Sequence, residues 1–153
     1  MVAAWPALEL AYKPDAAEAC RRMAAYWEQE ILDRPTIQVC APRPNPRPYP
    51  KSTHASLRER WFDVEYVVEC ADIRGANTYW GGECLPAFSP NLGPDVLAAC
   101  YGCELQFAET TSWSSPILKD WSRVPALKLK EDSPYLRAIL ELTRRSLEVG
   151  HGK

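Results

Sequence analysis

The sequence predicts an α/β fold, in which helices and strands alternate along the chain. Three segments, near residues 15–32, 56–73 and 134–149, carry apolar residues at helical spacing. Between them, short runs at 36–41 and 104–111 have the composition of strands. The chain has 153 residues, 46% of them hydrophobic, which is enough for one compact domain with an apolar core. We therefore expect a single α/β domain.

The first helix follows Pro14 and Asp15, residues that are typical of a helix start. Apolar side chains then recur at intervals of three and four residues and form one stripe: Cys20, Met23, Ala24, Trp27 and Ile31. Pro35 disfavours a helical residue before it, so we expect the helix to end near residue 32. The run 36–41 is short, apolar and flanked by prolines, and it predicts a buried strand.

Residues 56–73 form the clearest helical pattern in the sequence. Ser56 and Glu59 have the spacing of a capping box, in which each side chain bonds a free backbone N–H of the helix start. One face is apolar, with Leu57, Trp61, Val64, Val68 and Ala71. The opposite face is charged, with Arg60, Asp63, Glu65, Glu69 and Asp72. We expect the apolar face to contact the core and the charged face to be solvated.

A short helix and a strand are expected next. Pro94 suits the first position of a helix over 95–101, and Gly102 suits the position just after its end. The alternation of residue types over 104–111 predicts a strand.

The last helix is expected to begin at Ser133 and Pro134 and to stop at Gly150. Its predicted buried side chains are Leu136, Ile139, Leu140, Thr143 and Leu147. Arg144 and Arg145 lie toward its C-terminal end, where the helix dipole favours positive charge.

Charge and hydropathy exclude several classes of function. The net charge is −2, so no broad basic surface indicates a nucleic-acid partner. The first residues lack the cationic region and the apolar stretch of a signal peptide. No apolar run approaches the roughly 20 residues that cross a bilayer. We expect a cytoplasmic protein with no membrane partner.

Six cysteines are present, and we expect them to be free thiols, mostly buried, in a reducing compartment. Cys100 and Cys103 form a single C-x-x-C, which lies at a helix end instead of a helix start. A zinc site would need a second pair or histidines at ligand spacing, and the only histidines are His54 and His151. The sequence therefore predicts no metal site in this chain.

Two arginines four residues apart, Arg43 and Arg47, follow the predicted strand 36–41. Guanidinium groups placed in this way can bind the carboxylates of a substrate bidentately. Prolines alternate with the arginines, however, and such runs are often extended spacers. The residues alone leave both interpretations open.

Residues 88–95 lead into the predicted short helix and offer a second candidate site. The loop from Asn91 to Pro94 contains Gly93, and the first free backbone N–H groups after it, those of Asp95 and Val96, could bind an anion at the helix start. The alternative is a plain helix start with Gly93 as N-cap and Pro94 as first residue. Trp113 follows the next strand and either lines the same cleft or packs against the core or its rim.

Several stretches resemble the N-terminal part of the uroporphyrinogen decarboxylase-like superfamily, which includes cobalamin-linked methyltransferases. They are Tyr26–Pro35 with the strand after it, Asn77–Gly82, Leu85–Pro94 and Gly102–Phe107. The resemblance covers most of the chain after Ala16 and rests on the order of the segments. It implies a (β/α)8 TIM barrel about twice this length, with its active site at the C-terminal ends of the strands. Residues 1–153 would then be an N-terminal fragment, an incomplete barrel.

The resemblance carries over to site residues only in part. Decarboxylases of this superfamily have two arginines, four apart, after the first strand, and Arg43 and Arg47 match them, although their proline-rich surroundings differ. Those enzymes also have an aspartate after a Phe-Ser pair, whereas Phe88 and Ser89 are followed here by Pro90 and Asn91. A neutral amide cannot balance the charge of a cationic pyrrole cluster. No catalytic residue is identified. The expected substrate-binding residues are Arg43, Arg47, Phe88, Asn91, Gly93 and Trp113.

The missing aspartate favours a corrinoid-dependent methyltransferase or an uncharacterised branch over a true decarboxylase of porphyrin metabolism. If the full-length protein is an enzyme, the resemblance implies a lyase or a methyltransferase. The expected partner is a small anionic substrate or a corrinoid protein. Zinc, where used, would be bound by the later half of the barrel. The alternative is a non-catalytic, truncated or degenerate fragment that binds an anionic ligand or a partner.

Overall fold

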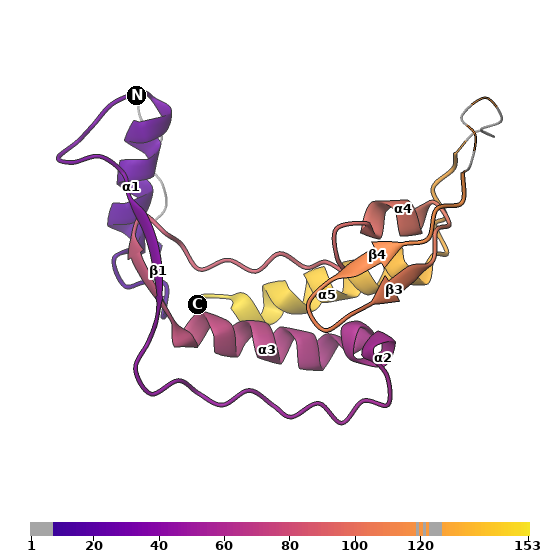
Figure 1. Cartoon of the computed structure of the whole chain (residues 1–153). Coiled ribbons are helices and arrows are strands. Elements are labelled where there is room, and N and C mark those ends of the chain that lie inside the picture. Colours follow the sequence, from indigo (N-terminus) through magenta and orange to yellow (C-terminus); the bar gives the residue numbers. More distant parts are fainter. Residues whose placement is uncertain (1–7, 119, 121, 123–126) are drawn as a thin grey trace. The chain divides into compact units, whose positions relative to one another are not determined.

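The structure, a computed structural model, describes residues 8–118, 120, 122 and 127–153 (Figure 1). Its elements, in chain order, are α1 (Ala16–Trp27), β1 (Gln38–Pro42), α2 (Leu57–Phe62), α3 (Val64–Asn77), β2 (Thr78–Gly82), α4 (Val96–Cys100), β3 (Leu105–Phe107), β4 (Ser112–Ser114) and α5 (Pro134–Gly150). The strands form two small antiparallel sheets, β1–β2 and β3–β4. Helices and strands are mixed along the chain, as expected. No parallel pairing and no barrel occur among the described residues, and the barrel stays a prediction.

The chain divides into two compact units. The first unit comprises residues 1–49, 70–88 and 150–153, and the second comprises residues 50–69 and 89–149. The first unit contains α1 and the β1–β2 sheet, and the second contains α2, α4, β3, β4 and nearly all of α5. We describe each unit by itself.

In the first unit, β1 and β2 pair with Cys40 opposite Trp80. The strand predicted at 36–41 is found as β1, but the prediction that it is buried is wrong, because Gln38, Val39 and Cys40 are exposed. A two-stranded ribbon leaves one face of each strand open unless another element covers it. Strand β2 was not predicted, because it contains two glycines and follows α3 without a break.

Helix α1 buries its small residues, Ala16, Ala19, Cys20, Ala24 and Ala25. Cys20 and Ala24 of the predicted stripe are therefore buried, but Trp27 is 75% exposed and Ile31 is exposed as well. The reason is that α1 ends at Trp27, and Gln29 takes a positive φ of 61° that turns the chain away from the helix. The expected end near residue 32 was too late.

The expected helix over 56–73 is two helices. Ser56 caps α2 as predicted, since its side chain accepts the Glu59 N–H at 3.2 Å, and Glu59 bonds back to the N–H of Ala55 at 3.0 Å. The break lies at Asp63, whose extended ψ of 97° ends α2 and whose carboxylate accepts the Tyr66 N–H at 3.0 Å. Asp63 thereby caps the next helix, a common role of aspartate.

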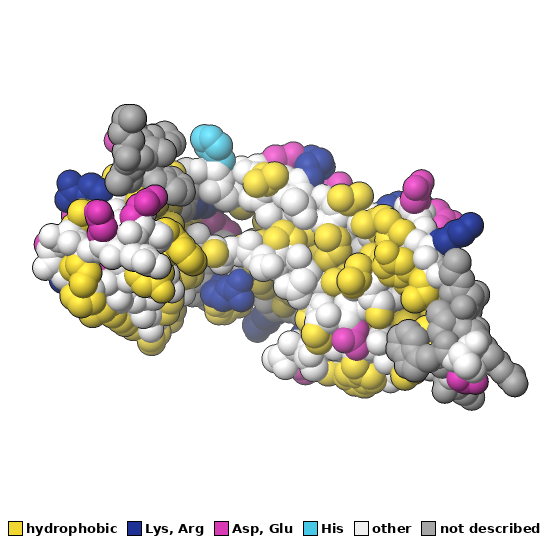
Figure 2. Space-filling model, turned by 90° about the horizontal axis from the view of Figure 1, so that it is seen from above, with side chains coloured by type: hydrophobic (Ala, Val, Ile, Leu, Met, Phe, Trp, Pro, Cys, Tyr) yellow, Lys and Arg dark blue, Asp and Glu magenta, His cyan; other side chains and the backbone are white. Residues whose placement is uncertain are grey.

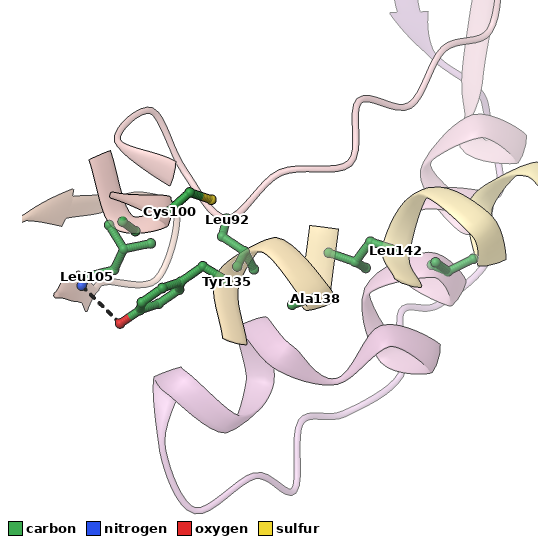
Figure 3. Close-up of a cluster of buried hydrophobic side chains, with 8 residues drawn as sticks. Leu92, Cys100, Leu105, Tyr135, Ala138 and Leu142 are labelled. Carbon is green, nitrogen blue, oxygen red and sulfur yellow. Dashed lines mark hydrogen bonds between the residues drawn. The ribbon is translucent and has the colours of Figure 1, made fainter. Parts of the chain in front are cut away.

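The core of the second unit is one cluster of buried side chains (Figure 3). Its members are Val68, Leu92, Ala99, Cys100, Leu105, Tyr135, Ala138 and Leu142. Trp61 and Val64 pack against it, which confirms the apolar face predicted for this stretch. Hydrophobic side chains also remain visible at the surface (Figure 2), as is usual for proteins of this size.

Helix α5 has the predicted boundaries, but the face that it buries differs from the predicted one. Leu142 is fully buried, whereas Leu140 and Leu147 of the predicted stripe are exposed. Tyr135 fixes the rotation of the helix, because its hydroxyl accepts the Leu105 N–H at 3.3 Å and donates to the Glu104 carboxylate (Figure 3). The buried stripe is thus shifted by about one residue, roughly 100° around the helix.

Candidate functional site

The segment after β1 is fixed to the junction of α3 and β2, within the first unit. The Asn77 side chain accepts the Arg47 N–H at 2.7 Å and donates to the Arg47 carbonyl at 2.9 Å. The Arg43 N–H donates to the Asn77 carbonyl at 2.7 Å. Between them Asn45 adopts a positive φ of 55°, so the chain bends here. Residues 43–47 are therefore held in place at both ends.

The side chains of Arg43 and Arg47 lie beside Tyr12. Arg43 Nε donates to the Thr78 carbonyl at 3.0 Å, and its terminal nitrogen reaches the Tyr12 carbonyl at 3.4 Å. The Arg47 guanidinium lies 3.8 Å from Asp72 Oδ2. The Tyr12 hydroxyl donates to Asp72 Oδ1 at 2.7 Å, and Gly75 of α3 has no Cβ that would press on its ring.

Lys153 completes this group, since its Nζ lies 2.7 Å from Asp72 Oδ1. Burial of Tyr12 and its bond to Asp72 raise the pKa of the phenol to about 12, so it stays a donor at neutral pH. Burial alone would raise the pKa of Asp72, but bonds from Lys153 and Tyr12 outweigh it, and the pKa is lowered. We call Tyr12, Arg43, Arg47, Asp72 and Lys153 the arginine cluster.

The other predicted site residues do not join the arginine cluster in any contact that the structure describes. Phe88 is half-buried in the first unit, and the Arg74 guanidinium lies 5.9 Å from its ring centre. Asn91, Gly93 and Trp113 belong to the second unit. The expectation that all six line one cleft stays a prediction.

Asn91 and Gly93 form a local turn. The Asn91 side chain accepts the Gly93 N–H at 3.0 Å and donates to the Ser89 carbonyl at 2.7 Å. Gly93 has a φ of 104°, and a Cβ there would lie 1.9 Å from Ser112 Oγ, so only glycine allows this approach to β4.

The prediction that Gly93 caps the short helix is wrong. Helix α4 begins at Val96, and its N-cap is Asp95. The Asp95 carboxylate accepts the N–H of Ser114 at 2.8 Å and its hydroxyl at 3.0 Å. A carboxylate at this helix start disfavours the anion site considered for residues 88–95. Gly102, with a φ of 112° just after the helix, has the predicted role.

Trp113 lies on β4 opposite Gln106 and is 46% exposed. Its position is at the surface of the second unit, where Gln106 also donates to Ser115 at 3.1 Å. The interpretation of Trp113 as a core residue is therefore wrong, and a position at the rim of the core or in a binding surface stays open.

Two buried charges in the first unit had no signal in the sequence. Lys13 is 2% exposed, and its Nζ donates to the carbonyls of Trp80 and Gly82 at 3.0 and 2.7 Å and to Asp15 at 2.9 Å. Glu83 is 1% exposed and is bound by the Arg34 guanidinium. These contacts join residues far apart in the sequence, and no local spacing marks them.

Glu83 is bound at both carboxylate oxygens. Arg34 donates to them at 2.7 and 2.9 Å, and the Ile37 N–H adds a third bond at 2.7 Å. Burial would raise the pKa of Glu83, but the bonds from Arg34 and Ile37 outweigh it and the pKa is lowered. Glu83 is therefore an anion at neutral pH.

No cysteine forms a disulfide bond in the described structure, and Cys20 and Cys100 are buried as expected. Burial raises the pKa of the Cys100 thiol. Cys40 is exposed, so the prediction of burial is wrong for it, because β1 has an open face. Among the described residues, no three His, Cys, Asp or Glu side chains are grouped as metal ligands would be.

None of the helices in the described part of the chain is long and apolar enough to span a membrane. Searches of protein-family models, curated proteins and solved structures returned no match to this chain.

Proposed function

We propose that this chain is the N-terminal part of a uroporphyrinogen decarboxylase-like protein, in a methyl-transfer or uncharacterised branch, and that Arg43 and Arg47 bind an acidic group of its substrate. The family assignment is based on the order of the resembling segments. The observation that carries the binding site is the arginine cluster, in which Arg47 and Lys153 lie beside the Asp72 carboxylate and Arg43 bonds the Tyr12 carbonyl next to them.

The charges of the arginine cluster favour an anion. Arg43, Arg47 and Lys153 supply three positive charges and Asp72 one negative charge, which leaves two positive charges for a ligand. The Arg47 side chain is 58% exposed, so an anion can reach it from solvent. Exposed ion pairs contribute little singly, and a specific ligand would need bidentate contacts to the two guanidinium groups.

The surface of the first unit also supports a position within a larger fold. Trp27, Ile31, Ile37 and Val39 are exposed large apolar residues of this unit. Exposed apolar residues are usual at protein surfaces, and these four are compatible with further protein packing on them. In the proposed barrel, additional strands and helices would cover them.

The role proposed for this chain is binding and orientation. Methyl transfer to a thiol uses a zinc ion that makes the thiol a thiolate. The residues described here do not group into a ligand set for it, so no part of the metal chemistry is assigned to them. Arg43 and Arg47 would hold the acidic end of the substrate, and the Tyr12 hydroxyl keeps its proton and fixes Asp72.

Calorimetric titration of the whole chain tests the binding site. The probes are 2-mercaptoethanesulfonate, a thiol with an anionic end, and coproporphyrin, a tetrapyrrole with carboxylates. Loss of one charge-assisted contact of about 1.5–3 kcal/mol should weaken binding about 10- to 150-fold in Arg43→Ala and in Arg47→Ala. Arg21 is an exposed arginine that bonds Glu18 outside the arginine cluster, so Arg21→Ala is the matched control and should bind as the natural chain does.

One outcome would contradict the proposal. Unchanged affinity for both probes in Arg43→Ala and Arg47→Ala would make the segment a proline-rich spacer. The variants should keep the melting temperature of the natural chain, because exposed substitutions usually change stability by less than about 0.5 kcal/mol.

The family assignment has its own test, which is the reading frame beyond Lys153. Further strand–helix units with a His and Cys ligand set would support methyl transfer, whereas a stop codon at this point would support the non-catalytic alternative. We expect no turnover of uroporphyrinogen by the full-length protein, because Pro90 and Asn91 replace the aspartate. Formation of coproporphyrinogen would overturn that exclusion.

A further inference from the structure

Two cysteines that are far apart in the sequence meet in the first unit. Cys40 lies in β1, Cys84 follows the end of β2, and their Sγ atoms are 3.1 Å apart. At this distance one thiol donates a hydrogen bond to the other. A disulfide bond is about 2.05 Å long, so the two sulfurs would need to approach by only about 1 Å to form one.

The turn after β2 places Cys84 over β1. Gly82 has a φ of 59°, and the Cys84 N–H donates back to the Gly81 carbonyl at 3.2 Å. A Cβ on Gly82 would lie 2.0 Å from the Ile37 carbonyl oxygen, so the turn passes β1 too closely for any other residue. The Glu83 N–H donates to that same oxygen at 2.8 Å.

Buried charges hold this turn in place. Lys13 Nζ donates to the carbonyls of Trp80 and Gly82, on the strand that leads into the turn. The Glu83 carboxylate, next to Cys84, accepts the Ile37 N–H at 2.7 Å. Five hydrogen bonds around the two thiols thus hold the backbone that brings them into contact.

The two thiols differ in access to solvent. Cys40 is exposed and Cys84 is half-buried. Burial raises the pKa of Cys84, and the hydrogen bond and charge of Cys40 raise it further, against the opposing charge of Lys13. Cys84 is therefore protonated at neutral pH, and Cys40 is the sulfur that a dissolved oxidant meets first.

We propose that Cys40 and Cys84 form a redox-active dithiol, which small-molecule disulfides oxidise reversibly to an intramolecular disulfide. The Cys40 thiolate attacks one sulfur of the small disulfide, forms a mixed disulfide and releases one small thiolate. Cys84 then loses its proton and attacks the Cys40 sulfur, and the second small thiolate leaves. Two cysteine thiols lose two electrons and two protons, and one small disulfide becomes two small thiols. This site is independent of the proposed function.

Thiol mapping of the whole chain tests the proposal. The chain is equilibrated in buffers of glutathione and glutathione disulfide of increasing oxidising strength, quenched in acid and treated with an alkylating reagent. Chymotrypsin cleaves after Phe88 and so separates Cys84 from Cys100 and Cys103 before mass spectrometry. The expected product is a Cys40–Cys84 linked peptide pair that lacks two hydrogens. Its yield should rise with the share of glutathione disulfide, and dithiothreitol should remove it.

Single substitutions separate the two roles. In Cys84→Ser, Cys40 should accumulate a glutathione adduct at least severalfold above the natural chain, because the thiol that would displace glutathione is missing. In Cys40→Ser, the half-buried Cys84 should stay free. Cys103→Ser, a half-buried cysteine of the second unit, is the control and should leave the linked yield unchanged.

The proposal fails if Cys40 and Cys84 of the natural chain are both alkylated in the most oxidising buffer. It also fails if Cys40 carries as much glutathione in the natural chain as in Cys84→Ser. The measurement on the natural chain decides the matter even where a serine variant does not fold.

Discussion

Replacing Lys13 with methionine removes one of the two buried charges of the first unit. The side chain is 2% exposed, and its ammonium group donates to the carbonyls of Trp80 and Gly82. Methionine has a similar length and fills the space but donates no hydrogen bond. The substitution therefore tests the polar contacts separately from packing.

The cost follows from the groups left without a donor. An unsatisfied buried acceptor costs about 1–3 kcal/mol, and since both carbonyls are only part-buried we take about 1–2 kcal/mol for each. The third partner, Asp15, has a side chain that is 63% exposed, so water replaces its ion pair at little cost. Lys13→Met should thus destabilise the first unit by about 2–4 kcal/mol.

Hydrogen exchange measured by mass spectrometry reports this loss locally. Peptides that cover β1 and β2 should exchange faster by roughly 30- to 700-fold, since each 1.4 kcal/mol corresponds to a factor of ten. Lys128→Met, an exposed lysine of the second unit, is the control and should leave both units unchanged. Exchange in β1 and β2 within threefold of the natural chain would refute the reasoning that these bonds stabilise the two strands.

Three further outcomes are expected. The pKa of Glu83 is lowered in the folded state, so its stabilising effect should be complete above its ordinary pKa of 4.5 and should be lost as the pH falls through the folded value. Acid melts of Glu83→Gln should lack this dependence on pH. Gly82→Ala should destabilise the β1–β2 sheet by more than about 2 kcal/mol, because its Cβ would lie 2.0 Å from the Ile37 backbone oxygen. Gly152→Ala, with a similar φ and open space, should cost about 1 kcal/mol in urea melts. Leu142→Ala should lower the free energy of unfolding of the second unit by about 2–5 kcal/mol, and Leu147→Ala should lower it by under about 0.5 kcal/mol. Equal losses would contradict the observed rotation of α5.

The helices were the part of the fold that the sequence predicted best. The capping box at Ser56 and the boundaries of α5 depend on local spacing, and both are found where expected. The break at Asp63 was missed because the apolar pattern continues through it. The buried face of α5 was misassigned because Tyr135 sets the rotation through bonds to Glu104 and Leu105, which no periodicity encodes.

The candidate sites were predictable only where neighbours in the sequence make them. Arg43 and Arg47 could be found by their spacing, but their neighbours Tyr12, Asp72 and Lys153 come from other parts of the chain. The contact between Cys40 and Cys84 spans 44 positions and depends on a glycine turn. Such contacts follow from tertiary packing, and a single sequence carries no local sign of them.

The small residues of α1 have a consequence for the response to temperature. The buried hydrophobic residues described in the first unit are alanines and one cysteine of α1, with Ile73 as the one large side chain. The heat capacity of unfolding arises mainly from apolar surface that becomes hydrated. The first unit should therefore have a small heat-capacity increment and a flat stability curve, held mainly by ion pairs and hydrogen bonds. The second unit, with its aromatic and leucine core, should show the more strongly curved dependence and should weaken more on cooling.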